Sequence, residues 1–237
     1  MGNDQFQYDV VYHVAVMNHW RDVVREQMAL LGGNRNWKSL TVSVGSDAEG
    51  PAEQAADLIR GIVGLREVRF FRLPLGMYEH GAMDLVDEVA GRGLAVLYFH
   101  AKAVSYTPPH AAFEDWRRYV NRLVAEADRW AEFLARSEFD ACGPMKLVDG
   151  DRGFTYFAGN FWMAKAEYLK GLGRYREFAA SGAGSLEHMD RHLAEMAVDR
   201  GKRMRGYAID GTLLSPLTVW WHLENWRRDG PPVGARV

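Results

Sequence analysis

Strand and helix patterns alternate through the first hundred residues, and this alternation constrains the fold more than any other feature of the sequence. Apolar, largely β-branched runs typical of buried strands are separated by segments with apolar residues at helical spacing. The expected strands are 9–17, 40–44, 68–71 and 94–99, and the expected helices are 19–31, 51–63 and 81–90. Connections of this length predict an α/β fold, with a mostly parallel sheet flanked by helices.

Parallel sheets of this kind bind ligands beyond the carboxyl ends of their strands. The residues that directly follow the expected strands are therefore the first candidates for a binding site. They are Asn18, residues 45–47, Arg72 and residues 100–102.

The second half predicts one long helix over residues 114–136, because its apolar residues from Trp116 to Leu134 fall on a single helical stripe. Strand-like runs follow at 139–142 and 154–164, and helical patterns at 166–172 and 185–200. No linker or repeat divides the chain, so we expect a single domain over residues 1–237 that ends in a disordered tail at 230–237. The tryptophans at 220, 221 and 226 suit either a core or a homodimer interface.

Composition narrows the classes of function. The net charge is −2, from 29 basic and 31 acidic residues, which argues against a protein that coats nucleic acid or a membrane surface. The single cysteine, Cys142, excludes an intrachain disulfide and a Cys-based zinc site. The first residues lack the pattern of a signal peptide, and no run approaches the roughly 18 apolar residues of a membrane span. We expect a cytoplasmic protein.

The segment from Tyr98 to Lys102 carries two candidate cations at the end of the fourth strand. Tyr98, His100 and Lys102 alternate, so they share one face of an extended chain. His and Lys can neutralise a diphosphate through charge-assisted hydrogen bonds. The alternative is a histidine packed at a strand end beside a solvated lysine.

The segment from Gly159 to Trp162 interrupts an apolar strand pattern with Gly-Asn. Such a break indicates a bend or the close approach of a ligand. Asn160 offers a donor and an acceptor, and the flanking aromatics can form a platform for a sugar or a base. A core strand with a β-bulge is the alternative.

Two acidic motifs leave metal binding open. Asp149 and Asp151 form a D-x-D triplet that could hold Mg²⁺ or Mn²⁺, although Asp-Gly between strand-like runs favours a hairpin turn. His188, His192 and Glu195 share a helix face that could bind zinc, although a polar helix face is favoured. The nearby carboxylates are candidates for a catalytic base; they are Glu187, Asp190 and Glu195.

Several segments together resemble a poorly characterised family of glycosyltransferase-like proteins from polysaccharide and natural-product clusters. They read VYHVAVMNHW, YFHAKAVSY, WRRYV, FDACG, FAGNFWMAKAEYL and RHLAE, and they span residues 8–196. The family pattern has Y-L-H-T-K-G, W-R-x-Y-M, D-x-x-G and F-S-G-N-F-W-W-A. The H-x-K and G-N-F-W motifs at this separation are more specific together than either is alone.

The resemblance implies a GT-A-like, Rossmann-type fold and transfer of a sugar from a nucleotide diphosphate to a hydroxyl or amine acceptor. It implies a nucleotide-binding half at 8–105 and an acceptor-side half at 106–229. Where such folds usually carry D-x-D, this chain has His100-Ala101-Lys102, so we expect no metal cofactor, with Mn²⁺ or Mg²⁺ as the alternative. A non-catalytic binder of nucleotides or carbohydrates is the alternative function.

The resemblance also implies roles for individual residues. The expected catalytic residues are His100, Lys102, Asp190 and Glu195; the donor-binding residues are Asn18, Tyr98, His100, Lys102 and Arg117; the acceptor or sugar-binding residues are Asp140, Gly159, Asn160, Phe161 and Trp162. Trp116 and Gly143 also match the pattern. The chain departs from it at Ala101 and Ala103, which replace Thr and Gly, and at Ala158 and Met163, which replace Ser and Trp.

Overall fold

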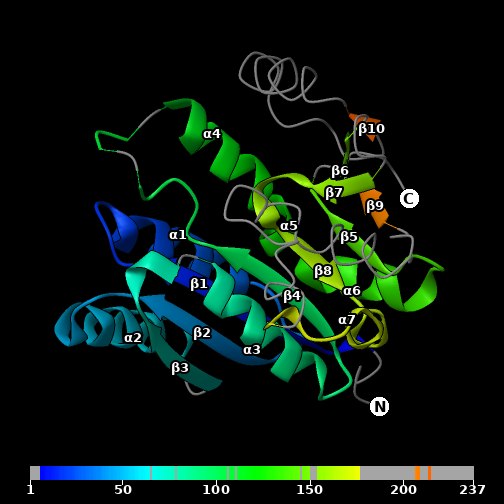
Figure 1. Cartoon of the computed structure of the whole chain (residues 1–237), viewed down its shortest axis with the longest axis horizontal. Coiled ribbons are helices and arrows are strands. Elements are labelled where there is room, and N and C mark those ends of the chain that lie inside the picture. The colour runs from blue at the N-terminus through cyan, green and yellow to red at the C-terminus, as the bar shows by residue number, and fades with distance from the viewer. Residues whose placement is uncertain are drawn as a thin grey trace.

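The computed structural model describes residues 6–64, 66–77, 79–105, 107–109, 111–144, 146–149, 154–176, 206–208 and 213–214. Within these residues, Figure 1 shows a twisted sheet with helices in front of it and behind it. Two of the predicted features, the helix at 185–200 and the tail at 230–237, lie outside the described residues.

The first half has the predicted alternation of strands and helices. Its elements are β1 (Tyr8–Ala15), α1 (Trp20–Gly32), β2 (Trp37–Gly45), α2 (Glu49–Val63), β3 (Glu67–Leu73), α3 (His80–Ala90) and β4 (Ala95–His100). The four strands are parallel and lie in the order β3-β2-β1-β4. The chain therefore adds strands first on one side of β1 and then on the other, and this reversal places a topological switch point between β1 and β4.

The second half completes the seven-stranded sheet, whose order is β3-β2-β1-β4-β8-β5-β9. Its elements are α4 (Ala111–Val120), α5 (Arg122–Ala125), α6 (Ala127–Arg136), β5 (Ala141–Gly143), β6 (Lys146–Asp149), β7 (Phe154–Phe157), β8 (Trp162–Ala164), α7 (Ala166–Leu172), β9 (Gly206–Ala208) and β10 (Leu213–Leu214). β8 runs antiparallel to both of its neighbours. β10, β6 and β7 form a separate small sheet. The predicted fold class, a mixed and mostly parallel sheet flanked by helices, is confirmed.

The long helix predicted over residues 114–136 is wrong, because the structure divides it into α4, α5 and α6. The side chain of Asn34 inserts at the second break. Its Nδ2 donates to the carbonyl of Val124 at 2.8 Å, and its Oδ1 accepts from the N–H of Asp128 at 3.0 Å. These two backbone groups would bond to each other in a continuous helix, so the side chain of Asn34 replaces one backbone hydrogen bond of that helix.

The continuous strand predicted over residues 154–164 is also wrong. β7 belongs to the small sheet and β8 to the large one, and the 3₁₀ turn η3 (Ala158–Asn160) separates them. Gly159 and Asn160 have φ values of 78° and 53°, and two successive left-handed residues redirect the chain. The predicted bend at Gly-Asn is therefore present.

The sheet carries a hydrophobic core on each face. Val10, Tyr12 and Val14 of β1 pack on the face covered by α1, α2 and the α4–α6 segment. Val11 of the same strand packs with α3 and α7 on the other face. This alternation follows from the period of two residues in a strand. Figure 1 shows α3 crossing in front of the sheet and α1 lying behind it.

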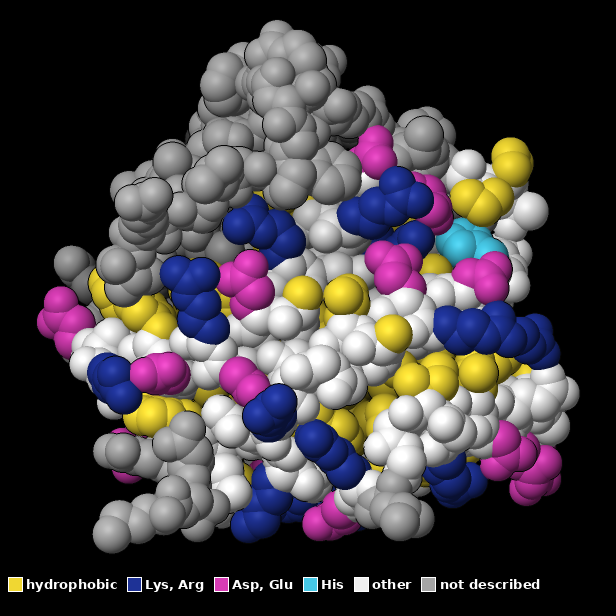
Figure 2. Space-filling view, turned by 180° about the vertical axis from the view of Figure 1, so that it is seen from behind, with side chains coloured by type: hydrophobic (Ala, Val, Ile, Leu, Met, Phe, Trp, Pro, Cys, Tyr) yellow, Lys and Arg dark blue, Asp and Glu magenta, His cyan; other side chains and the backbone are white. Residues whose placement is uncertain are grey.

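The surface mixes the two signs of charge. On the face drawn in Figure 2, the Lys and Arg side chains of the described residues alternate with Asp and Glu side chains instead of gathering in one area. This distribution agrees with the near-neutral net charge of −2. Among the described residues, no helix has the length and apolarity to span a membrane.

Candidate functional site

The ends of β1 and β4 meet at the switch point, as the sequence predicts for the candidate site. His13 and His100 are cross-strand partners, and the N–H of Ala101 donates to the carbonyl of His13 at 2.8 Å. Beyond them, Asn18 donates from Nδ2 to the carbonyl of Val104 at 2.7 Å. Two of the predicted donor-binding segments, around Asn18 and around His100, are thus held together by hydrogen bonds.

His100 is buried and is held through both of its ring nitrogens. Its Nδ1 lies 2.9 Å from Oε1 of Glu79, and its Nε2 lies 2.9 Å from the carbonyl oxygen of Gly159. Glu79 is the N-cap residue of α3, so the helix that follows β3 brings it to the carboxyl edge of the sheet. Only a doubly protonated imidazole can donate to both of these oxygens.

Asn160 ties the second motif to the same carboxylate. Its Nδ2 donates to Oε2 of Glu79 at 2.6 Å, and its Oδ1 accepts from the indole Nε1 of Trp162 at 2.9 Å. Trp116 packs against the turn from the other side, where a Cβ on Gly159 would lie 3.2 Å from the Trp116 indole nitrogen. The H-x-K and G-N-F-W motifs, about sixty residues apart in sequence, therefore interlock around Glu79.

The charge state of Glu79 follows from these contacts. Burial by itself raises the pKa of Glu79, but the charge and hydrogen bond of His100 and the charges of Lys102 and His13 outweigh burial and hold that pKa well below its usual range. The side chain of Glu79 is 15% exposed. A carboxylate that stays ionised this firmly is a poor proton acceptor, so it suits electrostatic and positioning roles better than general-base catalysis.

His13 differs from its partner. It is 3% exposed, and its Nδ1 lies 2.9 Å from Oγ of Ser43 on β2. Burial lowers the pKa of His13 to about 4, with Glu79 opposing this effect and His100 adding to it. His13 is therefore neutral at pH 7.

Lys102 is half-buried just beyond β4, where its charge lowers the pKa of Glu79. Its N–H donates to the carbonyl of His100 at 2.8 Å, which turns the chain sharply. The next residue, Ala103, has a φ of 72°. This left-handed backbone conformation favours glycine, which is the residue at this position in the pattern that the chain resembles.

Arg117 is buried in a separate polar network. Its guanidinium donates to Oε2 of Glu26 at 3.0 and 3.2 Å, and to the two carboxylate oxygens of Glu114 at 2.7 and 3.1 Å. Asn121 donates to the other oxygen of Glu26. The network joins α1 to α4. The predicted contact of Arg117 with a donor is not tested by this geometry and stays a prediction.

Asp140 lies away from the other predicted residues. Asp140 directly precedes β5, whose first residue, Ala141, pairs with Ala164 of β8. Ala164 also pairs with Val96, near the start of β4. Along the strand direction, Asp140 is therefore about five residues, or roughly 16 Å, from His100. The structure does not bring Asp140 to the carboxyl edge.

The predicted aromatic residues are core residues in the described chain. Tyr98, Phe161 and Trp162 are at most 1% exposed. Tyr98 packs against Trp162 with ring centroids 5.3 Å apart, and Phe161 packs against His100 at 5.1 Å. These side chains hold His100 in place, and their contact with a sugar stays a prediction.

The remaining predicted residues give less information. Asp190, Glu195 and the histidines at 188 and 192 lie outside the described residues, as does Asp151. Asp149 pairs with Phe154 at the end of the β6–β7 hairpin, which agrees with the turn interpretation of Asp-Gly.

The residues at the place where D-x-D is usual do not fit a divalent cation. Both nitrogens of His100 already contact oxygen atoms, and Lys102 offers a positive charge in place of a ligand. Within the part of the chain that the structure describes, no group of three or more His, Cys, Asp or Glu side chains is placed to hold a metal. Independence of metal stays a prediction.

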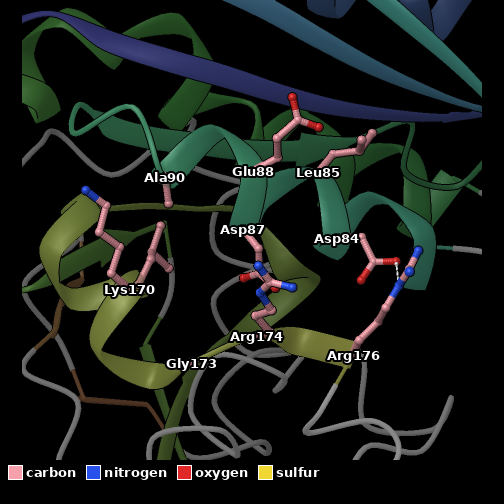
Figure 3. Close-up of a pocket in the computed structure, with 10 residues that line it drawn as sticks. Asp84, Leu85, Asp87, Glu88, Ala90, Lys170, Gly173, Arg174 and Arg176 are labelled. Carbon is pink, nitrogen blue, oxygen red and sulfur yellow. Dashed lines mark hydrogen bonds and ion pairs between the residues drawn. The ribbon is translucent and has the colours of Figure 1, made fainter.

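A separate cavity of about 540 Å³ lies between α3 and α7. In Figure 3, Asp84 and Asp87 of α3 point toward Arg176 and Arg174, which follow α7. Asp84 pairs with Arg176 at 2.8 Å, and Asp87 accepts from the N–H of Tyr175 at 2.6 Å. These contacts hold α3 and the segment after α7 together, so the polar side chains of the cavity serve the packing of these two segments.

Two site residues were missed from the sequence. Glu79 could have been found as an acidic residue at the start of a helix that follows a parallel strand, because such helix starts lie at the ligand-binding edge. His13 could have been found as the one histidine inside the apolar run from Val10 to Met17.

Comparisons with known proteins do not identify a family. No family model matches the chain, and no curated protein matches it. One solved structure that matches part of the chain is the mannosyltransferase PcManGT from Pyrobaculum calidifontis in complex with GDP-Man and Mn²⁺. It is 11% identical, with a TM-score of 0.43, and the match covers 71% of this chain and 47% of that chain. This chain thus spans about half the length of that protein, and a similarity this low assigns no activity.

Proposed function

We propose that the protein is a glycosyltransferase that moves a sugar from a nucleotide-diphosphate donor to a hydroxyl or amine of a polysaccharide or natural-product acceptor. One observation carries the proposal. His100 and Lys102, the cations of the H-x-K motif, lie at the carboxyl end of β4, beside the switch point of a mostly parallel sheet. Such switch points bind nucleotides in α/β folds.

In the proposed reaction, the bond between the sugar anomeric carbon and the diphosphate oxygen breaks, and the acceptor oxygen or nitrogen bonds to that carbon. The diphosphate leaves with the bonding electron pair, so negative charge develops on it in the transition state. Lys102 would stabilise this charge through its ammonium group. His100 would contribute its charge and would hold the loop, because a direct bond to phosphate would require one of its two contacts to break.

The acceptor proton must pass to a base. Glu79 is an unsuitable base, since its carboxylate accepts bonds from His100 and Asn160. Asp190 and Glu195 remain the proposed candidates. A second function, a non-catalytic nucleotide- or carbohydrate-binding protein, is favoured by the sequence after β4, which reads His100-Ala101-Lys102 where D-x-D is usual.

A binding panel tests the proposal. UDP-, GDP-, TDP- and CDP-sugars are added with and without Mn²⁺, and the thermal shift is measured. A ligand at one hundred times its dissociation constant stabilises by about 2.7 kcal/mol, which is readily detected. We expect one donor to bind without metal in the wild type and in Lys38→Ala, whose lysine is exposed on β2, and to lose binding in Lys102→Ala.

The outcomes separate the two functions. Consumption of the bound donor with acceptor present supports the transferase, whereas binding without consumption supports the binder. A shift that requires Mn²⁺, or equal donor binding by Lys102→Ala, would overturn the proposed role of the H-x-K motif.

A further inference from the structure

Glu79 is the point at which three segments converge. Its Oε1 faces Nδ1 of His100 at the end of β4, and its Oε2 faces Nδ2 of Asn160 in the turn before β8. Glu79 itself begins α3. The carboxylate is therefore the shared partner of two loops that belong to different motifs.

The orientation of Asn160 determines which group donates. The indole Nε1–H of Trp162 can only donate, so the amide atom that faces it at 2.9 Å is the oxygen of Asn160. The amide nitrogen must then face Glu79, at 2.6 Å. Glu79 consequently accepts at Oε2, which favours its ionised form.

The ionised carboxylate in turn determines the state of His100. The carbonyl of Gly159 has no proton to give, and neither has an ionised Glu79. Both contacts of 2.9 Å are therefore satisfied only when both ring nitrogens of His100 carry protons. A neutral ring would place one lone pair against an oxygen atom.

We infer that Glu79 is a positioning residue: its carboxylate keeps His100 doubly protonated, and this pair locks the loop that carries Lys102 against the Gly159–Asn160 turn. No step of the sugar transfer passes through Glu79. Its removal would free both the loop and the turn, because each loses a charge-assisted hydrogen bond. The consequence for ligand binding rests on the proposed function, whereas the protonation of His100 does not.

Several groups face His100 and bear on its charge. They are His13 on β1, Glu79 before α3, Tyr98 on β4, Lys102 after β4, and the carbonyl of Gly159. Burial lowers the pKa of His13 to about 4, so His13 adds no positive charge at neutral pH. Lys102 disfavours a second cation nearby. Among the titratable groups in this set, Glu79 is thus the one that favours the imidazolium.

Nitrogen-15 NMR of histidine-labelled protein tests the protonation directly. At pH 7.5 we expect both ring nitrogens of His100 in the wild type to show shifts of the imidazolium. The control variant Glu88→Gln, on the exposed side of α3, should show the same shifts. Glu79→Gln should show a neutral ring. A neutral His100 in the wild type, or a cationic one in Glu79→Gln, would overturn the inference; the wild-type measurement needs no variant to fold.

Pyrophosphate affinity tests the positioning. At each pH from 6 to 8.5 we expect Glu88→Gln to bind pyrophosphate as tightly as the wild type does, so that the ionisation of pyrophosphate itself cancels in the comparison. Glu79→Gln should bind pyrophosphate about tenfold or more weakly than the wild type, because the loop and the turn lose their charge-assisted hydrogen bonds, and Glu79→Asp should recover part of the loss. Equal binding by Glu79→Gln at every pH would overturn the positioning role. Failure of the wild type to bind pyrophosphate or any donor would instead overturn the proposed function, and the NMR result would stand.

Discussion

His13 and His100 lie opposite each other on β1 and β4, yet the structure gives them different charges. His100 contacts a carboxylate and a carbonyl, which require protons on both nitrogens. His13 contacts the hydroxyl of Ser43, which can donate to a neutral ring. Two adjacent buried imidazolium ions would repel each other, so the neutral state of one stabilises the charged state of the other.

The buried neutral His13 predicts a loss of stability in mild acid. The pKa of His13 is about 4 in the folded protein, against 6.5 for an ordinary histidine. Below about pH 6.5 the side chain of His13 therefore binds a proton in the unfolded chain but not in the folded chain. The free energy of unfolding consequently falls as the pH falls. The full effect, reached near pH 4, is about 3 kcal/mol.

Chemical denaturation between pH 5 and 7.5 measures this effect. His13→Gln should show a flatter dependence of the unfolding free energy on pH than the wild type. The pKa of the less buried His80 is lowered to a smaller extent, so His80→Gln should flatten the dependence less. Identical slopes in the wild type and His13→Gln would contradict the prediction.

Arg117 and Arg118 are neighbours that should respond very differently to substitution. Arg117→Met leaves Glu26 and Glu114 without their shared cation, and we expect a loss of about 3 kcal/mol. Arg118 is 57% exposed and lies 3.7 Å from Asp115, so Arg118→Met should cost less than about 0.5 kcal/mol. Urea unfolding of both variants measures the difference. A loss for Arg117→Met that is as small as the loss for Arg118→Met would show that the buried pairing is not stabilising.

Ala103→Gly should stabilise the protein. Ala103 has a φ of 72°, which disfavours a residue with a Cβ by about 1 kcal/mol. Glycine removes that strain but gains entropy in the unfolded chain, so we expect a net gain of about 0.5 kcal/mol. Ala101→Gly, at a buried position without positive φ, should instead lose about 1 kcal/mol. A loss of stability in Ala103→Gly would contradict the strained conformation.

Gly143→Ala should destabilise the core. A Cβ at this position would lie 2.5 Å from two ring atoms of Phe157 and 2.9 Å from its Cβ, so the aromatic residue must shift. We expect a loss of about 2 kcal/mol. Gly81→Ala meets mainly the flexible end of Leu73 and gains helix propensity, so it should change stability little. Equal effects of the two substitutions in thermal unfolding would contradict the packing argument.

The α4–α6 segment shows clearly what the sequence could predict and what it could not. The apolar stripe from Trp116 to Leu134 correctly predicts a helical segment that packs on one side. The break within it depends on Asn34, which is about ninety residues away in sequence. A pattern with the period of a helix carries no information about a side chain inserted from another element.

The sequence by itself determined the parallel half of the sheet and the edge at which β1 and β4 end, with the H-x-K motif at that edge. It could do so because periodicity and connection length are local properties. Tertiary structure alone decided that His100 and Asn160 meet at Glu79, that His13 stays neutral, and that Asp140 lies near the opposite edge. Charge states and shared partners depend on distances between elements, and these distances exist only once the strands and helices have packed.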